Sequence, residues 1–188
     1  MTATPLLCPG NGTPACGACR AAIGVATFAL GAAAVAQVLP DGEATMRIAG
    51  NVAQPVALGL DDLRKCAQRD VEITPPAGRA GEPVPRTRRY TGCLVRDLVA
   101  AAKPVEGRPR DLRRSYLVVT ARDGYQVVFS WAELFVSPVG ERALVAHTRD
   151  GAPLERAEGP IALVSGADVS AARHVKALQS IDLRTVAP

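Results

Sequence analysis

The sequence has 188 residues, of which 48% are hydrophobic and 21% are charged, an ordinary balance for a globular protein. This length holds one domain with an N-terminal extension and excludes two full domains of usual size. The formal net charge is +4, and the basic residues form local groups only around positions 86–89 and 108–114. Nucleic-acid binding needs a basic stripe beside stacking aromatic residues, so we expect no nucleic-acid partner.

An uncharged apolar run follows Arg20 and covers residues 21–39. It contains Ala34-Val35-Ala36, the pattern of small residues that signal peptidase recognises. We therefore expect residues 1–36 to be a signal peptide or leader, and the remaining domain to be periplasmic or otherwise exported. The alternative is a membrane anchor, because the run is almost long enough to span a bilayer. An uncleaved leader is the only membrane contact that we expect.

The cysteines fall into two groups. Cys16 and Cys19 have the spacing of half a zinc or redox site, but no second pair of this kind follows in the chain. We therefore assign no chemistry to the N-terminal segment. After cleavage of the leader only Cys66 and Cys93 would remain, and in an oxidising compartment they could form a disulfide. The sequence leaves this pairing and two unpaired buried thiols equally open.

The predicted domain spans residues 44–186. Alternation and turn signals predict strands at 44–49, 56–58, 70–74, 115–121, 125–129, 143–148 and 160–165. Helices are expected at 60–66, 93–102 and 130–134, surface loops at 75–89 and 105–114, and an extended segment at 174–183. Asp123-Gly124 predicts a tight hairpin, and Ser130 and Glu133 have the spacing of a capping box. Since strands outnumber short helices, the predicted fold class is α+β with a mixed β-sheet.

Five consecutive segments resemble the oxidoreductase molybdopterin-binding domain that sulfite oxidases and their relatives share. They are RIAGNVAQPVALGLDDLRKCAQRDVEI, RRYTGCLVRDLVAAA, ARDGYQVVFSWAEL, LVAHTRDGAPLERAEGPIALVSGAD and RHVKALQSIDL, and they cover about Met46 to Leu183. The resemblance implies an α+β fold that can cradle a pyranopterin. It also implies molybdopterin as the cofactor.

One element of the family pattern is missing. In catalytic members a cysteine thiolate between the first β-α-β stretch and the Y-x-G segment ligates molybdenum, but here this region reads VEITPPAGRAGEP, with Pro75 or a neighbour at that place. Cys66 precedes the region and Cys93 falls in a predicted helix, so neither matches the motif. Proline cannot ligate a soft metal. We therefore predict no catalytic and no metal-ligating residues.

The resemblance places Arg173, His174 and Lys176 on the family's basic segment that contacts the pterin. It therefore implies that these three residues bind the cofactor, and their chemistry suits a phosphate or a sulfur-rich anion. The alternative is that they are exposed charges on an edge strand. His147, in the middle of a predicted strand, is expected to be a packing or surface residue.

Three functions remain open on this evidence. The first is an exported domain that binds a pterin or a small anionic ligand without molybdenum redox catalysis. The second is a molybdopterin-dependent oxidoreductase with unusual metal ligation. The third is a non-catalytic protein-interaction domain, with an unidentified partner, whose old cofactor pocket is filled by side chains. Whether the domain is an enzyme is thus left open.

Overall fold

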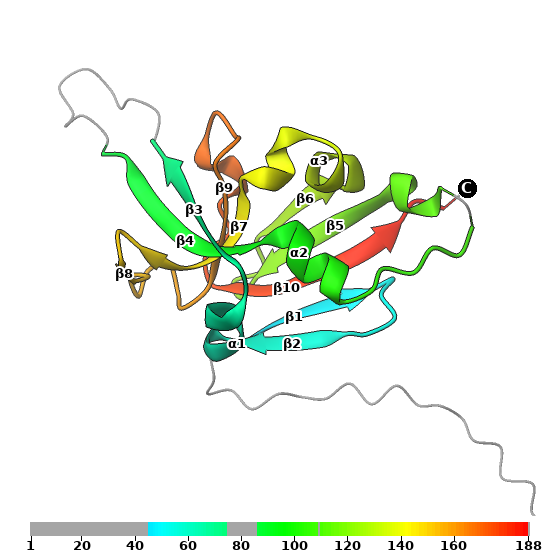
Figure 1. The fold of residues 1–188 in the computed structure, drawn as a ribbon, viewed down its shortest axis with the longest axis horizontal. Helices are drawn as coiled ribbons and strands as arrows, with labels where there is room; N and C mark the ends of the chain where they lie inside the picture. Colours follow the sequence, from blue (N-terminus) through cyan, green and yellow to red (C-terminus); the bar gives the residue numbers. More distant parts are fainter. Residues whose placement is uncertain (1–44, 75–85, 109, 188) are drawn as a thin grey trace, which may run out of the picture. The chain divides into compact units, whose positions relative to one another are not determined.

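The computed structural model describes residues 45–74, 86–108 and 110–187 (Figure 1). The predicted leader and most of the predicted loop at 75–89 lie outside the described residues, so the expectation of a signal peptide stays a prediction. Within the described ranges, no helix combines the length and the apolar character needed to cross a membrane.

The first sheet has the strand order β2-β1-β10-β5-β6 among the described residues. Its members are β1 (Thr45–Gly50), β2 (Val56–Gly59), β5 (Ser115–Ala121), β6 (Gln126–Ser130) and β10 (Leu178–Thr185). β1 runs parallel to β10, whereas the other neighbours are antiparallel. Figure 1 shows β10, the last strand of the chain, lying between β1 and β5. The sheet is therefore mixed, as the sequence predicts.

The second sheet is antiparallel and has the order β3-β4-β7-β8, with β9 also paired with β7. Its strands are β3 (Gln68–Ile73), β4 (Arg88–Leu94), β7 (Ala143–Arg149), β8 (Ala152–Pro153) and β9 (Ala162–Ser165). The helices of the described residues are short: α1 (Leu60–Lys65), α2 (Val95–Ala101), α3 (Trp131–Phe135) and the 3-10 turns η1 (Asp111–Arg114), η2 (Pro138–Glu141) and η3 (Ala171–Arg173). The predicted α+β class is confirmed.

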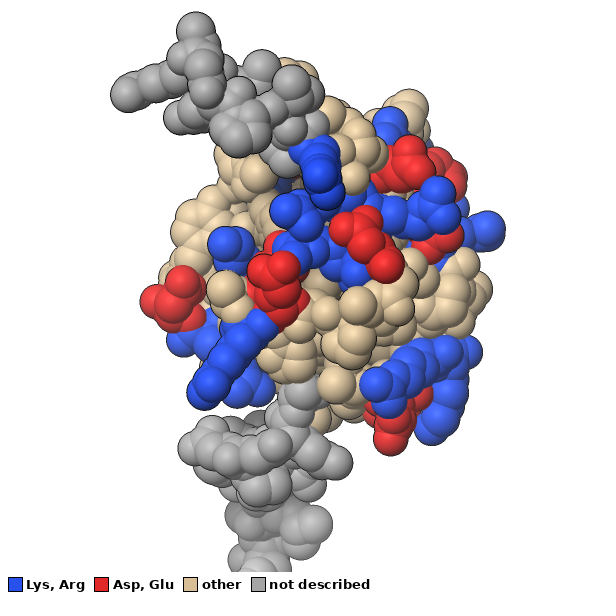
Figure 2. Space-filling view, turned by 90° about the vertical axis from the view of Figure 1, so that its left-hand side faces the viewer, with Lys and Arg blue, Asp and Glu red and all other residues tan. Residues whose placement is uncertain are grey.

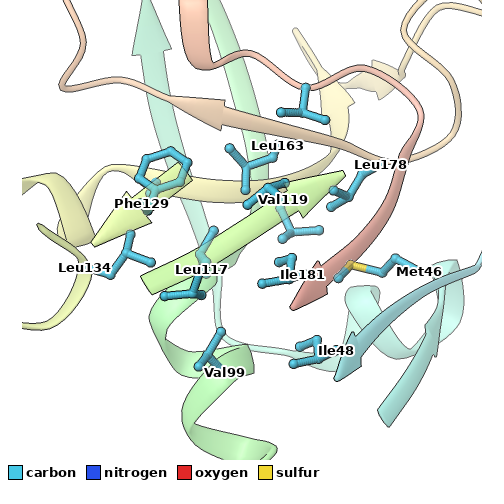
Figure 3. Packing of buried hydrophobic residues seen from close by; sticks show 14 of the residues in the cluster. Met46, Ile48, Val99, Leu117, Val119, Phe129, Leu134, Leu163, Leu178 and Ile181 are labelled. Atoms are coloured by element: carbon cyan, nitrogen blue, oxygen red, sulfur yellow. The ribbon is translucent and has the colours of Figure 1, made fainter. Parts of the chain in front are cut away.

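The main core lies between the two sheets. Leu163 of β9 points toward Val119 of β5, and Ile181 of β10 completes this layer (Figure 3). Strand periodicity gives the second sheet another buried face, because Val145 belongs to the main core and its neighbour Leu144 to a second cluster. Both faces of β7 are thus buried, and this strand rigidly positions Arg149 at its C-terminal end.

The local signals in the sequence are confirmed. Gly124 has φ +89° in the turn between β5 and β6, a conformation that favours glycine. The Ser130 hydroxyl accepts a hydrogen bond of 3.1 Å from the backbone N–H of Glu133, and the Glu133 carboxylate accepts one of 2.7 Å from the N–H of Ser130. This reciprocal capping box begins α3 at the predicted place.

The sequence prediction for residues 88–94 is wrong. Residues 88–94 form β4, where a loop and the start of a helix were expected, so Cys93 lies in a strand and α2 begins only at Val95. Pairing with β3 on one side and β7 on the other outweighs the helical pattern of this segment. The extended segment predicted at 174–183 is confirmed from Leu178 onward, where β10 begins as a central strand of its sheet.

Cys66 and Cys93 form a disulfide, which settles the alternative that the sequence leaves open. Their Cα atoms are 6.0 Å apart, within the usual range for such bonds. The bond joins the C-terminal end of α1 to β4. Cys93 is buried in the main core and Cys66 packs against that core from the side.

Candidate functional site

A pocket of about 270 Å³ opens at one end of the second sheet. The ends of β3, β4 and β7 form one wall, and the segment from Glu158 to Lys176 forms the other. The lining residues are Ile73, Thr74, Arg88, Tyr90, Arg149, Glu158, Asp168, Val169, Ser170, Ala171, His174 and Lys176. A pocket of this size lies at the small end of ligand sites, which usually hold about 300–1,000 Å³.

A buried cluster of three polar side chains, Tyr90, Arg149 and Glu158, forms part of the pocket wall. The Tyr90 hydroxyl donates a hydrogen bond of 3.0 Å to Oε1 of Glu158, and an Arg149 guanidinium nitrogen lies 2.9 Å from the same oxygen. The side chains of Arg149 and Glu158 are only 10% and 8% exposed. Burial, and next the Glu158 carboxylate, raise the pKa of Tyr90 above its ordinary value. The phenol therefore stays protonated and serves as a donor.

His174 stands beside this group. Its ring meets that of Tyr90 edge to face, with ring centroids 5.7 Å apart. Burial is the main cause that lowers the pKa of His174 below 6.5, and the nearby Lys176 and Arg149 charges lower it further, against an opposite effect of Glu158. The imidazole is thus neutral at neutral pH. Its Nε2 atom is buried and has no hydrogen-bond partner among the described residues.

Two cations that line the pocket, Lys176 and Arg88, are not held closely by a carboxylate. Lys176 is exposed and has no ion pair within the described part of the chain. Arg88 has one loose ion pair, in which its guanidinium nitrogen is 3.9 Å from a carboxylate oxygen of Asp150. Both carboxylates of the lining are already engaged, Glu158 by Arg149 and Asp168 by Arg173. These two cations are therefore the groups that can meet an anionic ligand. Figure 2 shows that basic and acidic side chains are interleaved on the side of the domain that carries β8.

Arg173 does not line the pocket. It forms a two-pronged ion pair with Asp168 through Nε and Nη2, and its third guanidinium nitrogen, Nη1, lies 2.8 Å from Glu133. The guanidinium also lies over the ring of Phe129, 4.2 Å from its centroid. Although burial opposes ionisation, hydrogen bonds from Ser130 and Arg173 hold the pKa of Glu133 below 4.5. Arg173 thus ties the loop that carries Asp168 to the cap of α3.

The structure separates the three residues predicted to bind the cofactor. His174 and Lys176 line the pocket, whereas the Arg173 side chain is committed to Asp168 and Glu133. Cofactor binding by any of the three stays a prediction. Sequence reasoning left open whether the Arg86–Arg89 segment lines a pocket, and Arg88 does; it missed three polar lining residues, Tyr90, Arg149 and Glu158. Tyr90 is the tyrosine of the Y-x-G segment, but nothing in the sequence pairs Glu158 with Arg149 or Tyr90.

His147 lies outside this pocket. Its Nε2 atom is 2.9 Å from the side-chain oxygen of Gln68, and it lines a separate cavity of about 370 Å³ with Arg64 and Arg156. Burial, and then the charge of Arg64, lower its pKa below 6.5. A neutral, hydrogen-bonded histidine of this kind fits the expected packing role.

Molybdenum does not fit the donor groups of the site. The disulfide engages both cysteines of the described residues, and the sequence has no other cysteine after Cys19. In residues 45–74, 86–108 and 110–187, no cluster of three or more His, Cys, Asp or Glu side chains could hold a metal ion. A soft metal requires a free thiolate or a comparable ligand set. Among the described residues, the site thus offers two cations, Lys176 and Arg88, but no free protein thiolate.

The sequence pattern of the family described as "Oxidoreductase molybdopterin binding domain" matches residues 33–187. Among solved structures, the fold is similar to that of the sulfane dehydrogenase SoxCD from Paracoccus pantotrophus, with a TM-score of 0.59 and 15% sequence identity. The similarity covers 76% of this chain and 39% of that one, so the chain spans well under half of the solved protein. No curated protein sequence matches significantly.

Proposed function

The chain belongs to the oxidoreductase molybdopterin-binding domain family, and on that premise we propose that it is an exported domain that binds a pterin or another small organic anion without molybdenum redox catalysis. The family assignment and the fold establish a molybdopterin-binding oxidoreductase-type domain. The identity of the ligand and the absence of metal chemistry are the proposed part.

The pocket carries the proposal. It joins a mainly apolar wall, which includes Ile73 and Val169, to the cations Arg88 and Lys176. Ligand sites of small organic molecules combine apolar walls with a few polar groups in this way. The cavity is open, which favours ligand binding over an interaction domain whose pocket is filled by side chains. The engaged cysteines favour binding over molybdenum catalysis.

The test of ligand binding is a titration with carboxypterin, a fluorescent pterin that carries one carboxylate, and with benzoate as a smaller aromatic anion. We expect both to perturb the amide chemical shifts of residues around Lys176, and Lys176→Gln to weaken binding by roughly fivefold to tenfold, the effect of one charge-assisted contact. Lys103→Gln is the matched control, because Lys103 lies in the turn after α2 and lines none of the pocket. If neither anion binds, or if both variants behave alike, the proposed binding function is wrong.

Export is a separate part of the proposal. An apolar run that contains the signal-peptidase pattern Ala34-Val35-Ala36 supports it. A disulfide in the domain supports it too, because disulfides persist in oxidising compartments. Mass spectrometry of the protein from a secreting host is expected to give a chain that begins at Gln37. A chain that retains residues 1–36 in the membrane fraction would instead indicate an anchor.

A further inference from the structure

The pocket wall contains a buried negative charge, that of Glu158, which a site for anions does not need. Glu158 is 6% exposed, and its Oε1 atom accepts a hydrogen bond from the Tyr90 hydroxyl and forms an ion pair with Arg149. The positive charge of Arg149 is therefore neutralised inside the wall and is not offered to a ligand. Arg149 is also paired with Glu155, so that the three charged groups together sum to −1.

The backbone holds Glu158 in this position. Its carbonyl accepts a hydrogen bond of 2.7 Å from the N–H of Ala177, and its own N–H donates one of 2.8 Å to the carbonyl of Glu155. Gly159 follows with φ +75°, and a β-carbon there would lie 2.8 Å from the Cα of Ala177. The chain thus passes tightly through this point, which fixes the backbone of Glu158, while Tyr90 and Arg149 hold its carboxylate.

Two polar atoms of the same wall lack partners. Oε2 of Glu158 and Nε2 of His174 are buried, and neither has a hydrogen-bond partner among the described residues. A buried polar atom without a partner costs about 1–3 kcal/mol, so such atoms mark places where water or a ligand completes the structure. A carboxylate oxygen can only accept, so its missing partner is an N–H or O–H donor.

We propose that the pocket selects a singly charged organic anion that carries its own N–H or O–H donor, and that Glu158 sets this preference. This inference rests on the proposed binding function. The anionic group of the ligand meets Lys176 and Arg88, and its donor meets Glu158. A doubly charged group such as a phosphate ester is disfavoured, because Arg149 offers no free charge and Glu158 repels a second negative charge.

The test compares three aromatic anions of similar size with the wild-type domain: meta-hydroxybenzoate, meta-methoxybenzoate and phenyl phosphate. The hydroxyl can donate to Glu158, and its methyl ether cannot. We expect meta-hydroxybenzoate to bind roughly tenfold more tightly than the ether, the effect of one hydrogen bond to a charged group, and phenyl phosphate to bind more weakly than either. Dissociation constants from amide chemical shifts measure this order.

Glu158→Gln gives the complementary result. Glutamine keeps an acceptor for Tyr90 but removes the buried carboxylate that pairs with Arg149 and leaves only the exposed Glu155, so phenyl phosphate should gain at least about tenfold relative to meta-methoxybenzoate. Glu155→Gln is the control, because Glu155 also pairs with Arg149 but is 67% exposed, and its removal should change the ratio little.

The two levels of the proposal fail in different ways. If the wild-type domain binds none of the three anions, both the binding function and the selectivity are wrong. If all three bind through Lys176 but the hydroxyl gives no advantage, or phenyl phosphate binds as tightly as the carboxylates, the binding function holds and the role of Glu158 is wrong. The wild-type comparison decides this even if Glu158→Gln does not fold.

Discussion

Cys66 and Cys93 are joined by a disulfide across 27 positions of the chain, from the end of α1 to the C-terminal end of β4. The bond has two consequences. It fixes the β1-β2-α1 segment to the second sheet, and it removes both thiols of the described residues from metal chemistry. The disulfide thus acts as a covalent brace between these two parts of the domain.

Reduction of this disulfide should weaken the domain. Closing a loop of this length stabilises a folded chain by about 3.5 kcal/mol, through the entropy that the unfolded chain loses. Urea denaturation of the wild-type domain with and without a phosphine reductant measures the difference. The Cys66→Ala, Cys93→Ala double variant is the control, since its midpoint should not respond to the reductant. Equal midpoints for oxidised and reduced wild-type protein would contradict the brace.

Arg173 should act as a positioning residue. Arg173→Ala removes the ion pairs with Asp168 and Glu133 and the contact with Phe129, and we expect it to lower the free energy of unfolding by about 2 kcal/mol. Because Asp168 lies on the pocket loop, binding of carboxypterin should also weaken.

Replacement by lysine separates this role from direct ligand binding. Lys keeps the charge but cannot form the two-pronged pair with Asp168. We therefore expect Arg173→Lys to be destabilised almost as much as Arg173→Ala. Full stability of Arg173→Lys, combined with intact ligand binding, would show that only the charge matters and would contradict a positioning role for the two-pronged pair with Asp168.

His174 should make stability depend on pH. Burial lowers its pKa in the folded domain below the value of 6.5 that it has in an unfolded chain. As the pH falls below about 6.5, the unfolded chain binds the proton first, so the free energy of unfolding decreases until the pH reaches the folded pKa. Above 6.5 the contribution is fully present.

Urea denaturation at pH 7.5, and at several values between about pH 6.5 and 5, follows this loss. His174→Gln should flatten the dependence in that window, whereas His147→Gln reports the separate share of the other histidine, whose pKa is also lowered. Titration of the His174 ring by NMR at or above 6.5 would overturn the prediction.

Gly92 should tolerate no side chain. A β-carbon at this position would lie 2.0 Å from the carbonyl oxygen of Val145, at the irregular register between β4 and β7. Both strands are fixed by pairing, so we expect Gly92→Ala to cost about 3 kcal/mol. Gly124→Ala is the control, because it meets no atom within 4 Å and carries only the strain of its positive φ, about 1–2 kcal/mol. A thermal melt in which Gly92→Ala is the milder change would contradict this.

Sequence reasoning succeeded where the determinants are local. The hairpin at Asp123-Gly124 and the cap at Ser130 and Glu133 each depend on residues within a few positions of one another. β4 was missed because its pairing with β3 and β7 involves residues distant along the chain. Its residues Cys93 and Leu94 are both buried, one on each face of the sheet, and this pattern looks helical in sequence.

The site was only partly predictable for the same reason. His174 and Lys176 were found through the family resemblance, and they do line a pocket. The contact between Tyr90 and Glu158 spans 68 positions, and only the folded sheet brings the two side chains together. Arg173 was predicted as a ligand-binding residue because it belongs to the same basic segment. A basic segment cannot reveal which of its side chains is already bound by an acid, here Asp168.

The most direct test of the central claim is an elemental analysis of the exported domain, purified from a host that makes molybdopterin, together with pterin fluorescence after oxidation. We predict no stoichiometric molybdenum, because the described cysteines are joined to each other and the rest of the domain offers no thiolate. Pterin without metal, or neither, agrees with a binding domain. Stoichiometric molybdenum together with pterin would contradict it and would identify an enzyme that ligates its metal without a cysteine thiolate.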